Sequence, residues 1–256
     1  MEKINEDVSI TIKSLKTKLS VDKNVTVSAS TIERAIKNFH YSFKRVQLVP
    51  ARRNTENNIK ERFIYANNYL ALNEDRIVFA DEMGMSCSIR SSYGRSLVGT
   101  TPRKLVRSIR SKNYSISAAM NKQGILLYEI LSTSFNGERY SQFIRKLLMK
   151  LKDMNMDNMI IIMDNCSIHK VKSVRALISD ENHTLMFLPP YSPQLNPIEE
   201  SFSKWKNAVK SSNPNTVVEL EEAIRTAHNS ITADDCENYF GHMRQFTLQA
   251  IRREDF

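Results

Sequence analysis

The sequence predicts an α/β fold, a mixed sheet flanked by helices, with a small helical unit in front of it. From residue 76 onward, short apolar runs typical of buried strands alternate with segments of helical periodicity. Before that point, the apolar residues recur at helical spacing. The 256 residues, 41% hydrophobic and 25% charged, suffice for one large domain with an appendage.

Composition excludes several classes of protein. No apolar run approaches the roughly 18 residues that a membrane span needs, and the N-terminus lacks the apolar core of a secretory signal. The three cysteines, Cys87, Cys166 and Cys236, lie far apart without a CxxC pair. A disulfide scaffold or a cysteine zinc site is therefore not expected, and a reducing compartment fits.

Residues 1–45 are predicted to form the helical unit. Apolar residues within 8–19 share one helical face, and residues 30–33 (Ser-Thr-Ile-Glu) have the form of a capping box that opens a second helix. Arg34 and Lys37 lie opposite the apolar face of this second helix. The pair fits a partial helix-turn-helix with Arg34 and Lys37 against DNA, and a plain helical hairpin is the alternative.

The rest of the chain is divided into a linker with a helical stretch (46–75), the α/β domain (76–215) and a C-terminal helical extension (216–256). The expected strands of the α/β domain are 77–80, 114–120, 124–131, 159–163 and 185–188, and its expected helices are 140–151 and the segment after Pro197.

Three acidic residues are the candidate catalytic groups. Two predicted strands run directly into Asp81 and Asp164, and strand ends of open α/β sheets are where ligands gather. Glu199 follows a proline-rich turn, with Asn196 as the expected N-cap and Pro197 as the first helical residue. A helix cap is the alternative for each aspartate alone, and Glu199 also suits the third position of a capping box.

A basic segment is the strongest charge feature. The chain has 37 Lys and Arg against 28 Asp and Glu, a net charge of +9. Residues 90–112 contain basic side chains and no acid, which favours contact with a polyanion over a solvated loop. These basic residues are Arg90, Arg95, Arg103, Lys104, Arg107, Arg110 and Lys112.

Three motifs make the sequence recognisable. They are residues 79–82 (Phe-Ala-Asp-Glu), 162–165 (Ile-Met-Asp-Asn) and 192–199 (Ser-Pro-Gln-Leu-Asn-Pro-Ile-Glu), with 34 residues between Asp164 and Glu199. They resemble the DDE transposases of the Tc1/mariner and IS630 superfamily, from about residue 25 to 210. The resemblance implies an RNase H-like catalytic domain that performs metal-dependent DNA cleavage and strand transfer in cut-and-paste transposition.

The resemblance also implies a cofactor and partners. Asp81, Asp164 and Glu199 would bind two Mg²⁺ (or Mn²⁺) ions, and hard cations do prefer carboxylate oxygens. The partners would be double-stranded DNA, at transposon ends and target, and a second copy of the chain in a homodimer on DNA. The nucleus of a eukaryotic host, or otherwise the cytoplasm or nucleoid, is the expected location.

Some features leave alternatives open. Asn165 suits either ligand orientation or a turn cap, and His169, in an Asp-Asn-x-x-x-His pattern of IS630-like relatives, is equally explained as a surface histidine. Glu82 is not a candidate catalytic residue, because a strand that continues past Asp81 turns the two side chains to opposite faces. Complete relatives begin with two helix-turn-helix units, whereas this chain has room for one. A domesticated or truncated remnant that binds DNA without transposing is therefore the alternative function.

Overall fold

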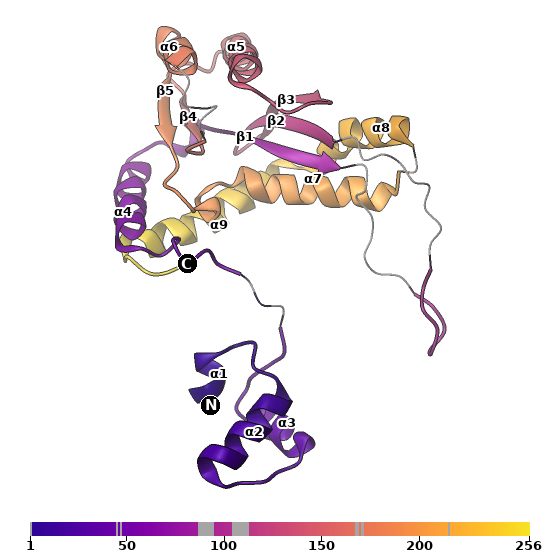
Figure 1. Cartoon of the computed structure of the whole chain (residues 1–256). Coiled ribbons are helices and arrows are strands. Elements are labelled where there is room, and N and C mark those ends of the chain that lie inside the picture. The colour runs from indigo at the N-terminus through magenta and orange to yellow at the C-terminus, as the bar shows by residue number, and fades with distance from the viewer. Residues whose placement is uncertain are drawn as a thin grey trace. The chain divides into compact units, whose positions relative to one another are not determined.

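The computed structural model describes residues 2–44, 46, 48–86, 95–103, 113–166, 169, 172–214 and 216–256. The chain divides into two compact units, residues 1–50 and 51–256. The first contains helices α1 (Glu2–Glu6), α2 (Ile12–Lys23) and α3 (Ala29–Asn38). The second contains α4 (Glu56–Leu70), β1 (Ile77–Ser86), β2 (Asn113–Asn121), β3 (Gly124–Leu131), α5 (Gly137–Asp153), β4 (Ile160–Met163), α6 (Lys172–Asp180), β5 (Thr184–Phe187), α7 (Ile198–Ser212), α8 (Val217–Ala227) and α9 (Ala233–Ile251), with short 3-10 turns at Glu74–Arg76, Pro193–Leu195 and His228–Ser230 (Figure 1).

Capping residues set where the helices of the first unit begin. The Thr11 side chain accepts a hydrogen bond from the Ser14 backbone, so α2 starts after the exposed Val8 instead of including it. The Ser28 side chain accepts from the Thr31 backbone at 3.1 Å, so α3 starts earlier than the predicted capping box. Both predicted helices are present, with shifted N-termini.

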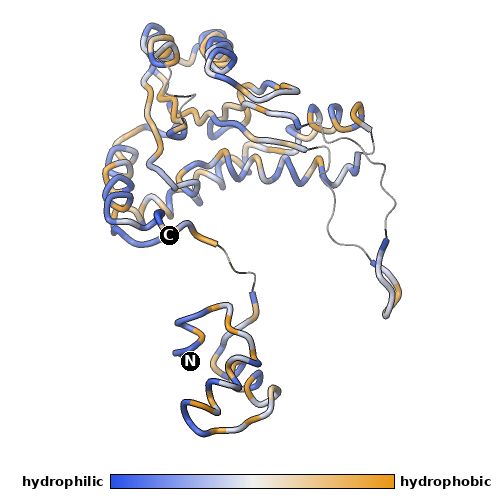
Figure 2. Tube along the Cα trace, viewed as in Figure 1, coloured by the Kyte–Doolittle hydropathy of each residue, from blue (hydrophilic) through white to orange (hydrophobic). Residues whose placement is uncertain are grey.

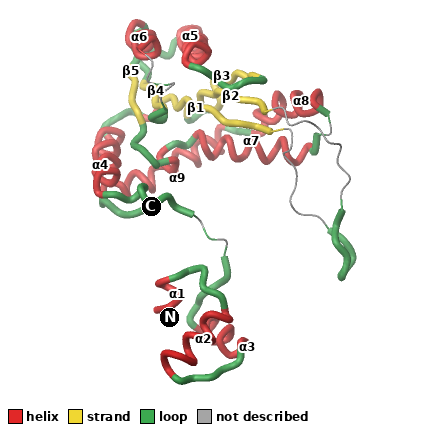
Figure 3. Tube along the Cα trace, viewed as in Figure 1, coloured by secondary structure: helices red, strands yellow, loops and turns green. Residues whose placement is uncertain are grey.

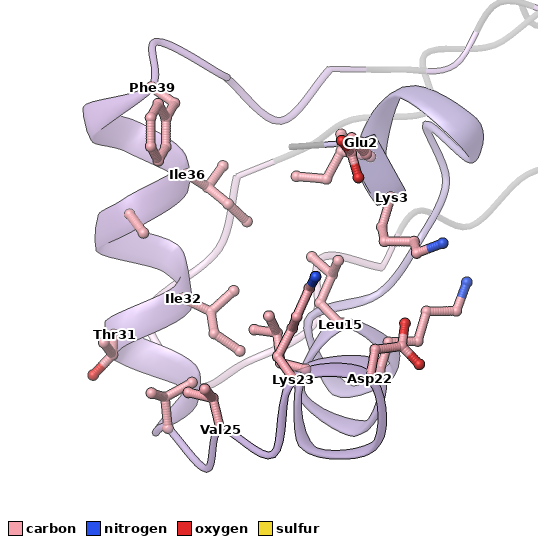
Figure 4. Close-up of a pocket in the computed structure, with 15 residues that line it drawn as sticks. Glu2, Lys3, Leu15, Asp22, Lys23, Val25, Thr31, Ile32, Ile36 and Phe39 are labelled. Atoms are coloured by element: carbon pink, nitrogen blue, oxygen red, sulfur yellow. The ribbon is translucent and has the colours of Figure 1, made fainter.

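A small apolar cavity lies among the three helices of the first unit. It has a volume of about 380 Å³, and α2 contributes Leu15, α3 contributes Ile32 and Ile36, and Phe39 follows at the end of α3 (Figure 4). Leu15 and Ile32 are the buried centre of this unit, whereas Phe39 is 59% exposed. The apolar face predicted for the second helix therefore does face the rest of its unit.

The second unit is built on one mixed sheet with the strand order β3-β2-β1-β4-β5. β1 pairs antiparallel with β2 and β2 with β3, while β4 pairs in parallel with β1 and with β5. The β4 sequence is entirely apolar, as its orange colour in Figure 2 shows, and its last three residues are buried. A continuous apolar run is what a central parallel strand requires, because helices cover both of its faces.

Helices cover the two faces of the sheet and form two cores (Figure 3). On one face, Phe79 of β1 meets Phe240 of α9 edge to face at 5.5 Å, and α4, α7 and α8 complete that core. On the other face, Val78 and Ala80 of β1 pack with α5 and α6. Successive residues of β1 thus serve opposite cores, as the pleat of a strand dictates.

The second unit extends beyond the predicted catalytic segment at both ends. Helix α4, within the predicted linker, packs against α9, and the Arg62 guanidinium lies 4.5 Å from the centre of the Phe256 ring. The indole of Trp205 in α7 donates a hydrogen bond to the Ile224 carbonyl of α8 at 2.9 Å. The C-terminal helices are therefore part of the core on the α7 side of the sheet.

Candidate functional site

The register of the sheet places the two aspartates beside each other. The parallel pairing of β1 with β4 ends at Ala80 opposite Met163, so Asp81 and Asp164 are the residues that directly follow this last pair. The prediction that both strands end there is wrong for β1, which continues to Ser86 because β2 still pairs with it. The two aspartates nevertheless converge at the carboxyl end of β4, where ligands gather in such sheets.

Asp81 is held rigidly from two sides. Its carboxylate accepts a hydrogen bond from the backbone of Glu82 at 2.7 Å and another from the Asn196 side chain at 2.7 Å. Only 7% of the residue is exposed. Burial raises the pKa of Asp81 to about 7, and the charges of Asp164, Glu199 and Glu82 act in the same direction, while the backbone hydrogen bond opposes them.

Asp164 has a different environment. Burial alone would raise the pKa of its carboxyl group, but hydrogen bonds from His169 and from the Cys166 backbone outweigh this, and the pKa is lowered. The side chain is 46% exposed, and its Oδ1 lies 2.6 Å from the His169 Nδ1. Two neighbouring aspartates thus have pKa values displaced in opposite directions.

Glu199 comes from a helix, whereas the two aspartates lie in or directly after strands of the sheet. It lies in the first turn of α7, which buries Ile198, Phe202 and Trp205 and so leaves Glu199 on an exposed face. Partial desolvation raises the pKa of its carboxyl group, which the Lys206 charge opposes and the Asp164 charge reinforces.

The turn before α7 differs from its prediction in one useful way. Pro197 is the N-cap, which makes Glu199 the second helical residue, and within the described part of the chain no side chain caps this helix. The capping-box alternative for Glu199 is therefore wrong. Asn196 does not cap α7 but donates to Asp81, because its side chain is buried against the sheet. This single contact links the proline-rich turn to β1.

All three predicted acidic residues line one cavity of about 430 Å³. Its other walls include Asn165 and the proline-rich segment 188–193. Among the described residues, no three His, Cys, Asp or Glu side chains are already grouped closely enough to hold a single metal ion. The three predicted carboxylates therefore line one cavity, but among the described residues they do not form a preformed site for a single ion.

Two residues outside the predicted set contact the site. His169 is fully buried, so the surface alternative for it is wrong, and its Nε2 lies 2.9 Å from Glu82 Oε2. Glu82 points away from Asp81, as the strand pattern indicated, but toward the α5 side, where it meets His169. No sequence spacing reveals this contact, because 87 positions separate the two residues.

The predicted DNA-contact residues are only partly described. Arg34 and Lys37 are exposed on α3, and Arg95 and Arg103 are also exposed. The remaining five lie outside the described residues: Arg90, Lys104, Arg107, Arg110 and Lys112. In the described part of the chain, no helix is both long and apolar enough to cross a membrane.

Comparison with known proteins identifies the family. The model of the DDE superfamily endonucleases matches residues 76–221, more than half of the chain and the whole of the site. The chain belongs to the DDE superfamily endonucleases. It is also 24% identical over 249 residues to the Tc3 transposase of Caenorhabditis elegans, covering 94% of this chain and 75% of that protein.

Solved structures with the same fold include complexes of the Mos1 transposase. The paired-end complex with the left transposon end has a TM-score of 0.80 at 19% identity, over 98% of this chain and 76% of that one. The mariner Mos1 paired-end complex with Mg has a TM-score of 0.77 at 20% identity, over 100% of this chain and 77% of that one. Together with the family match, these relatives confirm the predicted RNase H-like fold. They also confirm the predicted resemblance to DDE transposases of the Tc1/mariner type.

Proposed function

We propose that Asp81, Asp164 and Glu199 hold two divalent cations, Mg²⁺ or Mn²⁺, with which this DDE endonuclease cleaves transposon ends and joins them to target DNA. The observation that carries this proposal is the convergence of three carboxylates, from β1, the end of β4 and α7, on one cavity. The Mos1 complexes include one with Mn and one with Mg, which supports the use of these metals.

The chemistry of the residues fits such ions. All three donors are carboxylate oxygens, the ligands that Mg²⁺ and Mn²⁺ prefer. Their charges disfavour one another, since the charges of Asp164 and Glu199 both raise the pKa of Asp81. Bound cations would remove this repulsion, and the cavity of about 430 Å³ would accommodate them.

The residues of the chain orient the reaction. A water molecule attacks the phosphodiester at the element end and breaks its P–O3′ bond, which leaves a 3′-hydroxyl on one side and a 5′-phosphate on the other. The 3′-hydroxyl then attacks a phosphodiester of the target DNA and displaces the 3′-oxygen of the target strand. Divalent cations held by Asp81, Asp164 and Glu199 would activate the attacking oxygen and stabilise the leaving oxygen. Asn196 and the Glu82 backbone fix Asp81, and α7 carries Glu199 to the other wall of the cavity.

Double-stranded DNA is the proposed partner. The Mos1 structures are paired-end complexes and transpososomes, which supports binding of transposon ends and a homodimer on DNA. Arg34 and Lys37 on α3, together with the basic segment 90–112, are the proposed phosphate contacts. The protein would act in the nucleus of a eukaryotic host, or otherwise in the cytoplasm or nucleoid.

The alternative of a DNA-binding remnant is not favoured. The similarity to the Tc3 transposase covers 94% of this chain, and the three carboxylates share one cavity.

A nicking assay tests the proposed function. Supercoiled plasmid is incubated with the parent chain, Asp164→Asn, Glu199→Gln and the matched control Glu200→Gln, with Mn²⁺ or with EDTA. Glu200 adjoins Glu199 but pairs with His242 at 2.8 Å outside the cavity. We expect Mn²⁺-dependent nicking by the parent and the control, and none by the other two. Equal nicking by all four chains would contradict the proposal.

A further inference from the structure

A buried histidine connects the catalytic aspartate to the opposite core of the sheet. His169 has no exposed surface, and its ring lies between two carboxylates. Its Nδ1 is 2.6 Å from Asp164 Oδ1, and its Nε2 is 2.9 Å from Glu82 Oε2. The Nδ1 also lies 3.3 Å from the backbone carbonyl oxygen of Asp164. The three side chains therefore form a continuous chain of polar contacts from the cavity into the interior.

The interior end of this chain is anchored by the sheet. Glu82 of β1 stands directly opposite Ser117 of β2 in the antiparallel register. The Ser117 hydroxyl donates to Glu82 Oε1 at 3.1 Å, and Ser117 is itself fully buried. The ring of Tyr140 in α5 lies over the imidazole, with ring centres 4.3 Å apart. Two strands and one helix thus restrict how the imidazole can turn.

The charges along the chain alternate. Burial alone would lower the pKa of His169, but hydrogen bonds to Asp164 and Glu82, and their charges, raise it to about 10. A doubly protonated imidazole donates to both carboxylates at once. The imidazole is thus held by a carboxylate at each ring nitrogen.

The contacts of Asp164 leave one oxygen for a ligand. His169 and the Cys166 backbone both donate to Oδ1, the latter at 2.9 Å. Every hydrogen bond that the described residues make to this carboxylate ends on Oδ1, which leaves Oδ2 for a cation. Fixing one oxygen orients the other, which is how partners behind a metal ligand improve binding.

We propose that His169, backed by Glu82 and Ser117, is a positioning residue that orients the Asp164 carboxylate for cation binding. This inference rests on the proposed function, because it gives Asp164 the role of a ligand. His169 and Glu82 act through Asp164 and touch neither DNA nor the cation. The asymmetry of the site follows: Asn196 and a backbone amide fix Asp81, whereas a buried ion-pair chain fixes Asp164.

Mn²⁺ binding to the DNA-free chain, measured by calorimetric titration, tests the positioning role without any need for activity. The variants are His169→Gln, Glu82→Gln and Glu82→Ala, with His242→Gln as the matched control. His242 also contacts a glutamate, Glu200, but on the surface. Asp164→Asn reports the loss of the ligand itself, and thermal denaturation without metal reports folding separately.

We expect His169→Gln and Glu82→Ala to weaken Mn²⁺ binding by roughly 10- to 100-fold, the usual effect of removing a partner behind a ligand. Glu82→Gln should retain most of the affinity, because its amide oxygen still accepts the His169 N–H. His242→Gln should bind like the parent. Rescue by glutamine at position 82 separates positioning from loss of bulk packing.

Three outcomes would overturn the inference. If His169→Gln and Glu82→Ala melt at lower temperature but bind Mn²⁺ as the parent does, the chain of contacts is structural only. If His169→Gln does not fold, equal affinities of Glu82→Gln and Glu82→Ala contradict it. If the folded parent binds no Mn²⁺, or binds it as Asp164→Asn does, the proposed function itself fails. Only the last outcome removes the metal site.

Discussion

Replacing Asp81 by asparagine should stabilise the metal-free protein at alkaline pH. The Asp81 carboxyl is 7% exposed, and burial raises its pKa from 3.8 to about 7. A carboxyl whose pKa is higher in the folded state binds more protons when folded, so stability falls as pH rises from 3.8 to 7. At 1.36 kcal/mol for each pH unit, the loss is about 4 kcal/mol above pH 7.

Asparagine removes this loss at a smaller cost. Both donors to Asp81, Asn196 and the Glu82 backbone, now face one carbonyl oxygen and one amino group, so one hydrogen bond worth about 1 kcal/mol is lost. We therefore expect Asp81→Asn to be about 1 kcal/mol less stable at pH 4 and about 3 kcal/mol more stable at pH 8. Such differences are large beside the 5–15 kcal/mol of a typical domain.

Urea unfolding in EDTA at pH 4 and pH 8 measures this difference. Trp205 is the only tryptophan and is fully buried in the second unit, so its fluorescence follows that unit alone. Asp157→Asn, a change at an exposed aspartate, serves as the control. If the parent and Asp81→Asn lose the same stability between the two pH values, the Asp81 carboxylate is not desolvated and the reasoning is wrong.

The remaining predictions concern the other aspartate and DNA binding. Asp164→Asn should destabilise the metal-free protein at pH 7, because the folded protein lowers the pKa of the Asp164 carboxyl. The stability that this carboxylate contributes is present above its unfolded pKa of 3.8 and is lost as the pH falls through the folded value. Thermal melts of both chains at pH 7 and pH 3 would detect the difference. Neutralising Arg103, Lys104 and Arg107 together should weaken binding to all DNA sequences and reduce the slope of log K against log salt by up to roughly 3; an unchanged slope would remove the basic segment from the binding surface. Neutralising the two exposed α3 cations should reduce the slope by up to about 2 in the same titration.

The local spacing of apolar residues predicts most of the helices and strands. Each expected strand is present, because runs such as Ile160–Met163 can be buried on both faces only inside a covered sheet. The expected strand stops at Ala80, where the continuous apolar run ends, whereas β1 continues to Ser86 with side chains that alternate in burial (Glu-Met-Gly-Met-Ser). Two helices start earlier than expected because a residue upstream caps them, Ser28 for α3 and Asn136 for α5.

The acidic residues of the site could be predicted because each follows a local signal, whereas their supporting contacts could not. Asn196 and Asp81 are 115 positions apart, and Glu82 and His169 are 87 apart. Contacts of this kind depend on the strand order and on which face of β1 each side chain occupies. The sequence alone predicts that successive side chains of a strand lie on opposite faces of the sheet. It does not predict which distant residue each of them contacts there.

The opposite environments of Asp81 and Asp164 follow from their positions on the sheet. Asp81 points to the α7 side, where a neutral amide is its side-chain partner, so burial dominates and raises its pKa. Asp164 follows the last residue of β4, and although burial opposes it, the contact with His169 at 2.6 Å and the hydrogen bond from the Cys166 backbone lower its pKa. Under the proposed function both groups bind the cation as carboxylates, so a cation would have to displace a proton from Asp81 below about pH 7, whereas the lowered pKa of Asp164 favours its ionised form. The register that makes the two residues neighbours thus places their carboxyl groups in environments that shift their pKa values in opposite directions.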